Sequence, residues 1–234
     1  MKSTLSTLLF AGLFLAGILI PEPVASQNNN VNRADIVTHD FFYGIMGKST
    51  GTDCPGKSFY TRVAFLRVIR DYKYKDFARS GTIDDSKREL AAFFAHVTHE
   101  TGHFCYIEEI DKQVYCDISN EYPCAPNKRY YGRGPLQITH NYNYGAAGRS
   151  IGFDGLGNPD IVANDPMISF RTALWFWMTK VHSVMGQGFG ATINAINGNE
   201  CKGGNAGQVN SRVGYYMDYC KQFGVSTGPG NLKC

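Results

Sequence analysis

The sequence predicts one mainly α-helical domain with long connecting loops. Apolar residues recur at helical spacing in several segments, and the best marked of these begins at Ser86. Stretches rich in glycine, proline and asparagine separate the segments, as at 154–164. The chain has no internal repeat and no change of composition along its length. A single domain therefore accounts for the predicted fold.

The first 26 residues are predicted to be a secretory signal peptide. Lys2 is followed by an apolar run over 8–20, and then by prolines and small residues as far as Ser26; this order is typical of a cleaved leader. A membrane span is the alternative, but about 13 apolar residues are few for the ~20 that cross a bilayer. Residues 27–234 then form the mature domain, which is long enough to bury a core.

Charge and cysteine content narrow the class of protein. The net charge of +3 comes without a block of basic residues, so no nucleic-acid partner is expected. A secreted chain should oxidise most of its seven cysteines and leave one over. Six cysteines allow 15 pairings, so spacing alone does not assign them. Cys116 and Cys124 enclose a short loop that contains a proline, and they make the simplest local pair.

Helices are expected in both halves of the chain. The first spans 36–47, and the second spans 58–72 with an apolar face formed by Phe59, Val63, Leu66 and Ile69. Ser86 and Glu89 have the spacing of a capping box, and Gly102 is the expected end of that helix. The segment 103–110 is aromatic and β-branched enough to predict a short strand.

Loops and further helices fill the C-terminal half. Two glycines and a proline within 130–139 predict an extended loop or hairpin. Asp165 and Pro166 form a helix start with proline at the first helical position. The remaining helices are expected at 141–148, 167–181, 192–197 and 208–223, the last of them ended by Gly224.

The stretch His96–Glu109 concentrates three carboxylates and three imidazoles beside an apolar run. It can be an acid/base site, a zinc site, or the polar end of a core helix. His99-Glu100-Thr101-Gly102-His103 matches the H-E-x-x-H zinc motif, which needs an unbroken helical turn. Gly102 within that turn costs roughly 1 kcal/mol, and no third ligand is marked. No metal and no cofactor are therefore expected.

Glu100 and Glu109 are candidates for a pair of catalytic carboxylates. Nine residues of continuous helix would leave them on opposite faces, whereas a helix that ends at Gly102 lets both point into one cleft. Inverting glycoside hydrolysis uses two carboxyl groups roughly 6.5–9.5 Å apart, with water between them. Glu100 adjoins the apolar helix face, which favours it as the protonated acid. Only one of Glu108 and Glu109 can share that cleft, and the residues alone do not say which.

Longer motifs extend beyond this stretch. The strings AHVTHETGHFCYIEEI, YYGRGPLQITHNYNYG, INGNEC and SRVGYYMDYC resemble the plant chitinases of glycoside hydrolase family 19, most of all their loop-shortened class IV form. The resemblance covers essentially the whole of 27–234. It implies a lysozyme-like, bilobed, α-rich fold with a small β element. It also implies an endochitinase that hydrolyses chitin and chitooligosaccharides with inversion.

The resemblance assigns roles by position. Glu100 matches the general acid, Glu109 the general base, and Thr139 a hydroxyl that helps to hold the attacking water, where many members have serine. Sugar subsites are matched by Gln137, Tyr142, Asn143 and Asn197. An ion-pair network that orients the base is matched by Glu200 and Arg212, although the loop before Glu200 is one residue shorter than the usual pattern. His99 and Arg133 are expected to support these groups, whereas His96, His140 and His182 have no partner spacing that predicts a role.

The resemblance also implies the disulfides Cys54–Cys105, Cys116–Cys124 and Cys201–Cys234, with Cys220 left free. Class IV members usually carry a chitin-binding module after the leader, whereas here Gln27 runs into the catalytic domain. Weaker affinity for insoluble chitin is therefore expected. We further expect a monomer that is secreted to the apoplast and has no membrane attachment. The alternatives are hydrolysis of peptidoglycan or of a lipochitooligosaccharide signal, a catalytically silent chitin-binding or cell-wall protein, and a zinc peptidase.

Overall fold

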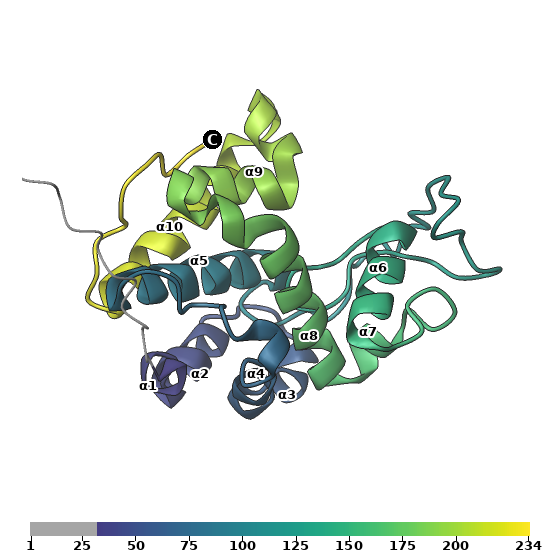
Figure 1. Ribbon diagram of the computed structural model, residues 1–234, viewed down its shortest axis with the longest axis horizontal. Helices are drawn as coiled ribbons and strands as arrows, with labels where there is room; N and C mark the ends of the chain where they lie inside the picture. The colour runs from purple at the N-terminus through teal and green to yellow at the C-terminus, as the bar shows by residue number, and fades with distance from the viewer. Residues whose placement is uncertain (1–31) are drawn as a thin grey trace, which may run out of the picture.

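The computed structural model describes residues 32–234, so the predicted signal peptide and the predicted mature start at Gln27 lie outside it. The described residues fold into helices joined by long loops (Figure 1). The α-helices are α1 (Arg33–Ile36), α2 (His39–Gly47), α3 (Gly56–Phe59), α4 (Arg62–Val68), α5 (Ile83–Thr101), α6 (Asn141–Ile151), α7 (Ile161–Asn164), α8 (Pro166–Phe176), α9 (Phe189–Asn199) and α10 (Ala206–Gln222). Shorter helical turns are η1 (Tyr72–Tyr74), η2 (Trp177–Val181), η3 (His182–Gln187) and η4 (Glu200–Gly204).

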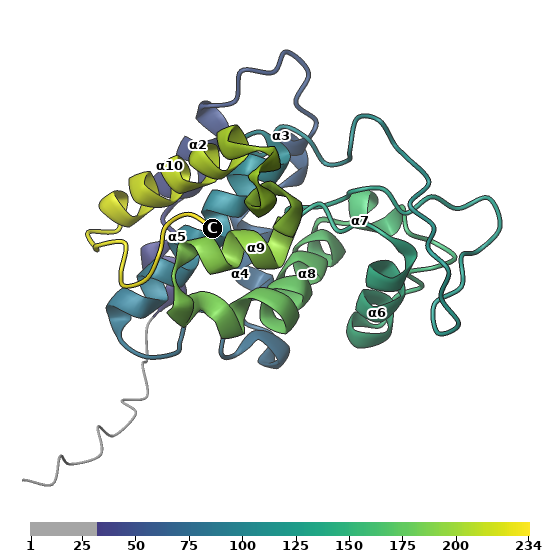
Figure 2. The ribbon, with the colours of Figure 1, turned by 90° about the horizontal axis from the view of Figure 1, so that it is seen from above.

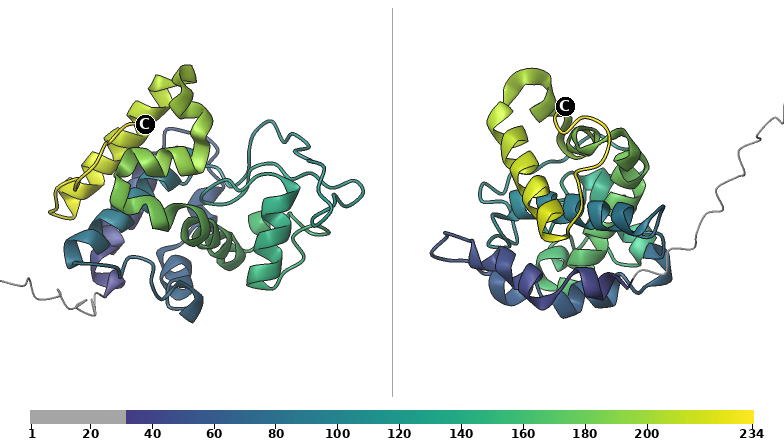
Figure 3. Two further views of the ribbon diagram at one scale, coloured as in Figure 1. Left: turned by 45° about the horizontal axis from the view of Figure 1, so that its top comes forward. Right: turned by 90° about the vertical axis from the view of Figure 1, so that its left-hand side faces the viewer.

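Two hydrophobic cores divide the molecule into lobes. The larger core joins α2, α4, α5, α8, α9 and α10, and we call this part the helical body. The smaller core contains Tyr130, Ile138, Tyr144, Ala147 and Val162; we call residues 107–164 the small lobe. Figure 1 shows α5 in the middle of the helical body, α6 and α7 in the small lobe on the right, and α8 between them. Figures 2 and 3 show α10 lying against α5, with which it makes extensive contact.

Helix α5 forms because both of its ends are capped. The Thr82 hydroxyl accepts from the Asp85 amide, and the Asp85 carboxylate accepts from the Thr82 amide, which makes a capping box. The predicted box at Ser86 and Glu89 is therefore wrong by one turn. Ser86 is buried inside the helix, where its hydroxyl donates to the Thr82 carbonyl. Gly102 ends α5 in the left-handed conformation, with φ of 56°, as predicted.

The segment 103–110 is not the strand that its composition predicts. His103 and Phe104 continue the left-handed backbone of Gly102, with φ of 63° and 61°, and that conformation is incompatible with a strand. The amides of Cys105 and Tyr106 both bond back to the Thr101 carbonyl, so the chain curls over the end of α5. Pairing in the described residues is limited to isolated bridges that join Arg133 to Glu108 and to Ile138. The β element is thus smaller than expected.

Both predicted N-terminal helices are interrupted by a capping threonine, and the second also ends early, with α4 stopping at Val68. The expected helix 36–47 is interrupted at Thr38, whose hydroxyl caps α2. The expected helix 58–72 is interrupted at Thr61, whose hydroxyl caps α4. The spacing places Val63 on the apolar face, but Val63 is 72% exposed. The reason is that a new helix begins at Arg62, so its buried face does not continue that of α3. The predicted start of α8 is confirmed. Asp165 precedes Pro166, the first helical residue, and its carboxylate accepts from the amides of residues 167 and 168.

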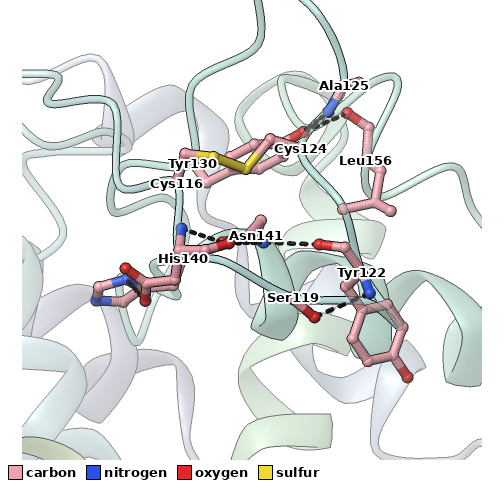
Figure 4. The surroundings of a disulfide bond; sticks show 10 residues. Cys116, Ser119, Tyr122, Cys124, Ala125, Tyr130, His140, Asn141 and Leu156 are labelled. Carbon is pink, nitrogen blue, oxygen red and sulfur yellow. Dashed lines mark hydrogen bonds and ion pairs between the residues drawn. A yellow bond between two sulfur atoms is a disulfide. The ribbon is translucent and has the colours of Figure 1, made fainter.

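Disulfides fasten the loops to both lobes. Cys54 bonds to Cys105, Cys116 to Cys124, and Cys201 to Cys234. Cys220 is free and buried. Figure 4 shows the Cys116–Cys124 bond above the side chain of Asn141, which ties the same loop to the start of α6. No helix among the described residues is both long and apolar enough to span a bilayer.

Candidate active site

A cavity of about 960 Å³ is lined by residues from both lobes. The helical body contributes Glu100 at the end of α5, together with residues of α9. The small lobe contributes the loop that carries Glu109 and the start of α6. Its polar and aromatic lining includes Glu100, Tyr106, Glu108, Glu109, Tyr115, Gln137, Thr139, His140, Tyr142, Asn143, Lys180, Asn197 and Asn199. Every residue predicted to be catalytic or to bind sugar therefore lies on one cavity.

Glu100 occupies the last turn of α5 and is mostly buried. Its side chain is 19% exposed, and its Oε1 accepts from Arg212 Nη2 at 2.6 Å. Burial raises the pKa of this carboxyl, and it outweighs the guanidinium of Arg212, which acts in the opposite direction. Glu100 therefore holds its proton to a higher pH than an ordinary glutamate does. A raised carboxyl pKa is the feature that general acid catalysis requires.

Arg212 joins Glu100 to a second carboxylate on the helical body. Its Nε and Nη2 donate to the two oxygens of Glu200 at 2.9 and 2.8 Å, a forked ion pair that is almost fully buried. Asn197 donates to the same carboxylate at 2.9 Å, from a non-helical backbone position inside α9. This network contacts Glu100, whereas we expected it to orient Glu109. The reason is that α10 packs along α5, which carries Glu100, whereas Glu109 bonds to Tyr115 and Gly132 of the small lobe.

Glu109 is held by the small lobe through two donors. The Tyr115 hydroxyl donates to Oε1 at 2.8 Å, and the Gly132 amide donates to Oε2 at 3.0 Å. The Glu109 amide in turn donates to the Gly132 carbonyl at 2.8 Å, so backbone and side chain are fixed to the same residue. Both carboxylate oxygens and the backbone of Glu109 are thus fixed at the cavity wall by the small lobe.

Glu108 has a different set of partners, although it also reaches the cavity wall. It accepts from Lys112 at 2.8 Å and from the Tyr131 hydroxyl at 2.9 Å, and Arg133 Nε lies 3.4 Å away. Burial raises the pKa of Glu108, but its hydrogen bonds with Lys112 and Tyr131 outweigh that effect and leave the pKa below its ordinary value. With one oxygen bonded to Lys112 and the other to the Tyr131 hydroxyl, Glu108 is engaged in structural pairs. The environment therefore favours Glu109 over Glu108 as a base.

Thr139 lies on the cavity wall with its hydroxyl hydrogen already committed. Its Oγ1 donates to the carbonyl of Gln137 at 2.8 Å. The remaining lone pairs can only accept. A water placed between Thr139 and Glu109 would therefore donate one hydrogen to each and keep a lone pair for attack. This arrangement suits the role that the resemblance implies for Thr139.

The four residues predicted to bind sugar are arranged around the same cavity. Tyr142 is 39% exposed and stacks on the ring of His140 at 5.2 Å. Asn143 donates to the Thr139 carbonyl, and Gln137 donates to the carbonyls of Ile107 and Gly134, so both amides are fixed by backbone contacts. Asn197 lies on the opposite side of the cavity, on α9, where it meets Glu200.

The supporting residues His99 and Arg133 belong to different lobes. His99 contacts Ser211 of α10 at 3.3 Å, and burial, aided by Arg212, lowers its pKa to about 4. Arg133 is buried in the small lobe, where it donates to Tyr144 and packs its guanidinium on the Tyr131 ring at 3.6 Å. Arg133 thus lies beside Glu108 in the small lobe, whereas Glu100 is paired with Arg212.

The two histidines of the H-E-x-x-H motif do not share a partner. The ring of His103 meets Tyr215 at 5.1 Å, and His99 meets Ser211. The left-handed turn at Gly102 separates the two residues, as its position in the motif suggests. Within 32–234, no group of three or more His, Cys, Asp or Glu side chains is placed to hold a metal ion. The geometry of this motif thus gives no support to the zinc interpretation.

Sequence reasoning missed Tyr115 and His96. Tyr115 lies in a loop six residues after Glu109 and bonds to it. The backbone of Tyr115 has a φ of 45°, and no sequence periodicity predicts that conformation. His96 precedes Glu100 by one helical turn, a spacing that could have suggested a shared partner. That partner is Arg212, which is more than a hundred residues further along the chain. Neither contact can be inferred without the fold.

Comparison with known proteins places this geometry in context. The family profile described as chitinase class I, from glycoside hydrolase family 19, matches residues 36–185 and 182–234. Chitinase 4 of Oryza sativa subsp. japonica is 62% identical over 214 residues, which is 90% of this chain and 74% of that protein. Endochitinase A of Zea mays is 61% identical over 206 residues, covering 87% of this chain and 72% of that protein.

Solved structures agree with the fold. The crystal structure of a family 19, class IV chitinase from Zea mays superimposes with a TM-score of 0.81 at 59% identity. The match covers 86% of this chain and 98% of that one. Chitinase C from Streptomyces griseus superimposes with a TM-score of 0.75 at 37% identity, covering 85% of this chain and 80% of that one.

Proposed function

This chain belongs to glycoside hydrolase family 19, the family of class I chitinases, and from that premise we propose how its cavity cleaves chitin. The chain is an endochitinase that hydrolyses β-1,4 bonds between N-acetylglucosamine units. We assign Glu100 as general acid and Glu109 as general base, in a single displacement with inversion. The supporting observation is that one cavity holds a buried carboxyl group with a raised pKa from the helical body and a hydrogen-bonded carboxylate from the small lobe.

Protonation of the leaving group falls to Glu100. Its carboxyl proton passes to the glycosidic oxygen as the bond from that oxygen to the anomeric carbon breaks. The charge that appears on Glu100 then faces Arg212 Nη2, already 2.6 Å away. Arg212 therefore stabilises the product of the proton transfer without moving. Glu200 holds the guanidinium in place through the forked pair.

Attack by water falls to Glu109 and Thr139. The water donates one hydrogen to Glu109 and one to Thr139, and its oxygen bonds to the anomeric carbon from the face opposite the leaving group. The proton that the water loses goes to Glu109, so one carboxyl group gives a proton and the other gains one. The Thr139 hydroxyl is oriented for this task because it donates to the Gln137 carbonyl.

The test is hydrolysis of a soluble N-acetylglucosamine hexamer, with the product anomers resolved and EDTA present in a parallel reaction. We expect wild type to release the α-anomer and to be unaffected by EDTA. Glu100→Gln should lower kcat by about 10²–10⁴-fold, the usual size of a general acid contribution. Glu109→Gln should do the same, whereas Glu108→Gln should lower kcat much less, because Glu108 is paired with Lys112 and Tyr131.

Three outcomes would contradict this assignment. Release of the β-anomer would rule out single displacement. A wild type that binds the hexamer without cleaving it would indicate a silent chitin-binding protein. Loss of activity in EDTA would restore the zinc interpretation of His99 and His103.

We propose that residues 27–234 act as one monomeric domain, secreted to the apoplast after removal of residues 1–26. The support is the order of charge, apolar run and small residues in the first 26 positions. N-terminal sequencing of protein recovered from the extracellular fluid should begin near Gln27. Size-exclusion chromatography with light scattering should give the mass of one chain, and a mass of two chains would contradict the monomer.

A further inference from the structure

His96 is a buried polar residue that the hydrolytic mechanism does not use. It lies on α5 one turn before Glu100, so the two side chains point to the same face of that helix. Its side chain is fully buried, and its ring stacks on Phe189 at 4.9 Å. A buried imidazole needs hydrogen-bond partners for both of its nitrogens. His96 has both partners, and one of them is Arg212.

The partners of His96 assign its tautomer. Arg212 Nη1 lies 3.1 Å from Nδ1, and a guanidinium can only donate, so Nδ1 is the unprotonated acceptor. The proton is then on Nε2, which donates to Thr192 Oγ1 at 2.9 Å. The Thr192 hydroxyl in turn donates a hydrogen bond to the Phe189 carbonyl at 2.6 Å. The chain of donors thus runs in one direction, from Arg212 to the backbone of α9.

Arg212 presents two edges to two different elements. The edge formed by Nε and Nη2 carries the forked pair with Glu200 of η4. The edge formed by Nη1 and Nη2 faces α5, where Nη1 reaches His96 and Nη2 reaches Glu100. Two residues one helical turn apart therefore share one guanidinium edge. Because His96 takes Nη1, Glu100 receives a single N–H from that edge.

We propose that His96 is a positioning residue that holds Arg212 to a one-point contact with Glu100, so that the acid keeps its proton. Without the acceptor at Nδ1, the Nη1 group would have no partner in this buried site, and an unpaired donor is costly. The guanidinium would then move toward the nearest carboxylate on α5, which is Glu100. A closer ion pair favours the charged form of Glu100 and makes it a poorer acid.

The charged groups that act on Glu100 within the helical body are Arg212 of α10 and Glu200 of η4, and His99 is its neighbour on α5. Across the cavity lie Glu108, Glu109, His140 and Lys180, which substitution of His96 leaves in place. Burial lowers the pKa of His99 to about 4, so His99 stays neutral through the range in which a raised glutamate titrates. The pKa of His96 is lowered well below its ordinary value, by burial first and by Arg212 second, so His96 stays neutral as well. A change in the alkaline limb of the pH profile would thus report on Glu100.

The experiment compares the pH dependence of kcat/KM for hexamer hydrolysis in wild type, His96→Leu and His96→Asn. Leucine removes the acceptor, whereas the Oδ1 of asparagine can replace Nδ1. In His96→Leu we expect the alkaline limb to move down by about 0.5–1 pH unit, the size of a modest change in a neighbouring charge. We also expect a lower kcat with a nearly unchanged KM. His96→Asn should restore most of the wild-type limb.

The matched control is Thr98→Val, which removes another buried hydrogen bond between α5 and α10, to the Tyr219 hydroxyl, without touching Arg212. It should lower stability but leave the alkaline limb in place. If His96→Leu does not fold, Thr192→Val removes only the acceptor of Nε2, and it should move the limb in the same direction by less. An unmoved limb in a folded, active His96→Leu or Thr192→Val protein would overturn the inference. The inference rests on the proposed function, and inactive wild type would mean that the function itself had failed.

Discussion

Glu108 and Glu109 are neighbours with the same side-chain chemistry, yet their surroundings give them different uses. Glu108 meets Lys112 and Arg133, which neutralise its charge within the small lobe. Glu109 accepts instead from two neutral donors, the Tyr115 hydroxyl and the Gly132 amide, and among the described residues it is in no ion pair. At the scale of single residues, the hydrogen-bond and ion-pair partners of a glutamate therefore decide its role. Those partners cannot be identified from the sequence alone.

Tyr115 and Tyr131 allow that distinction to be tested, because each phenol donates to one of the two carboxylates. Tyr115→Phe frees Glu109 to rotate, so we expect kcat to fall by about tenfold, the cost of one lost hydrogen bond of about 1.4 kcal/mol. KM should change little, since the carboxylate acts on water. Tyr131→Phe removes the equivalent bond to Glu108. Steady-state kinetics on the hexamer should give a smaller loss for Tyr131→Phe, and an equal or larger loss would argue that Glu108 takes part in the reaction.

Glu100 could be predicted as an acid from sequence, whereas its surroundings could not. The apolar stripe of α5 and the stop at Gly102 are local, and together they place Glu100 at the edge of a core. Arg212 and Glu200 come from α10 and η4, which sequence reasoning linked to the site only through the family resemblance. That resemblance also directed the pair to the base, and the structure corrects this because α10 packs on α5.

At the scale of elements, local patterns located most helices but only some of their ends, such as Gly102 after α5 and Asp165 before α8. The apolar spacing over 58–72 correctly indicates helix, but it does not show that a new helix begins after Thr61. That new start turns Val63 toward solvent. The strand expected at 103–110 fails for a similar reason. Its composition favours β structure, but the left-handed residues that follow Gly102 fold the chain back onto α5. Capping and backbone handedness override composition where the chain reverses.

Glu89 shows how one residue of α5 joins two further elements. Its carboxylate accepts from the Trp177 indole at 2.8 Å, from His182 at 2.6 Å and from the Ala78 amide at 2.9 Å. The carboxylate thereby fixes η2 and η3 against the start of the long helix. The hydrogen bond with Glu89 raises the pKa of His182 above its ordinary value and outweighs burial, which acts in the opposite direction.

This raised pKa predicts a pH-dependent contribution to stability. The folded protein binds the His182 proton more tightly than the unfolded chain, so the contribution is complete below the unfolded pKa of about 6.5. It is lost as pH rises through the higher folded pKa. Urea unfolding should give a larger difference between wild type and His182→Gln at about pH 5 than at about pH 9. The control is His39→Gln, at an exposed histidine beside Asp40, and it should change stability little at either pH. An equal cost of His182→Gln at both values would contradict the linkage.

At the scale of the whole molecule, the site depends on two cores of unequal size. The proposed acid, Glu100, and its ion pair belong to the helical body, and the proposed base, Glu109, and its donor Tyr115 belong to the small lobe. Helix α8 contacts α4 on one side and α6 and α7 on the other, so it is the element on which the two lobes meet. The small core buries few residues, and the Cys116–Cys124 bond and Asn141 reinforce it from outside (Figure 4).

Unequal cores predict unequal local stability. Amides of the small-lobe core, such as those of Tyr130 and Tyr144, should exchange with solvent through an opening of lower free energy than the amides of α5. Replacing both Cys116 and Cys124 by serine removes the constraint on a short loop, worth at most about 2–3 kcal/mol. Native-state hydrogen exchange should then be faster in the small lobe by tenfold or more, and unchanged in α5. The same variant should lose activity more readily on warming, because Glu109 is held by this lobe while Glu100 is not. Equal acceleration in α5 would mean that the lobes open as one unit, and the acid and base would then share a single stability.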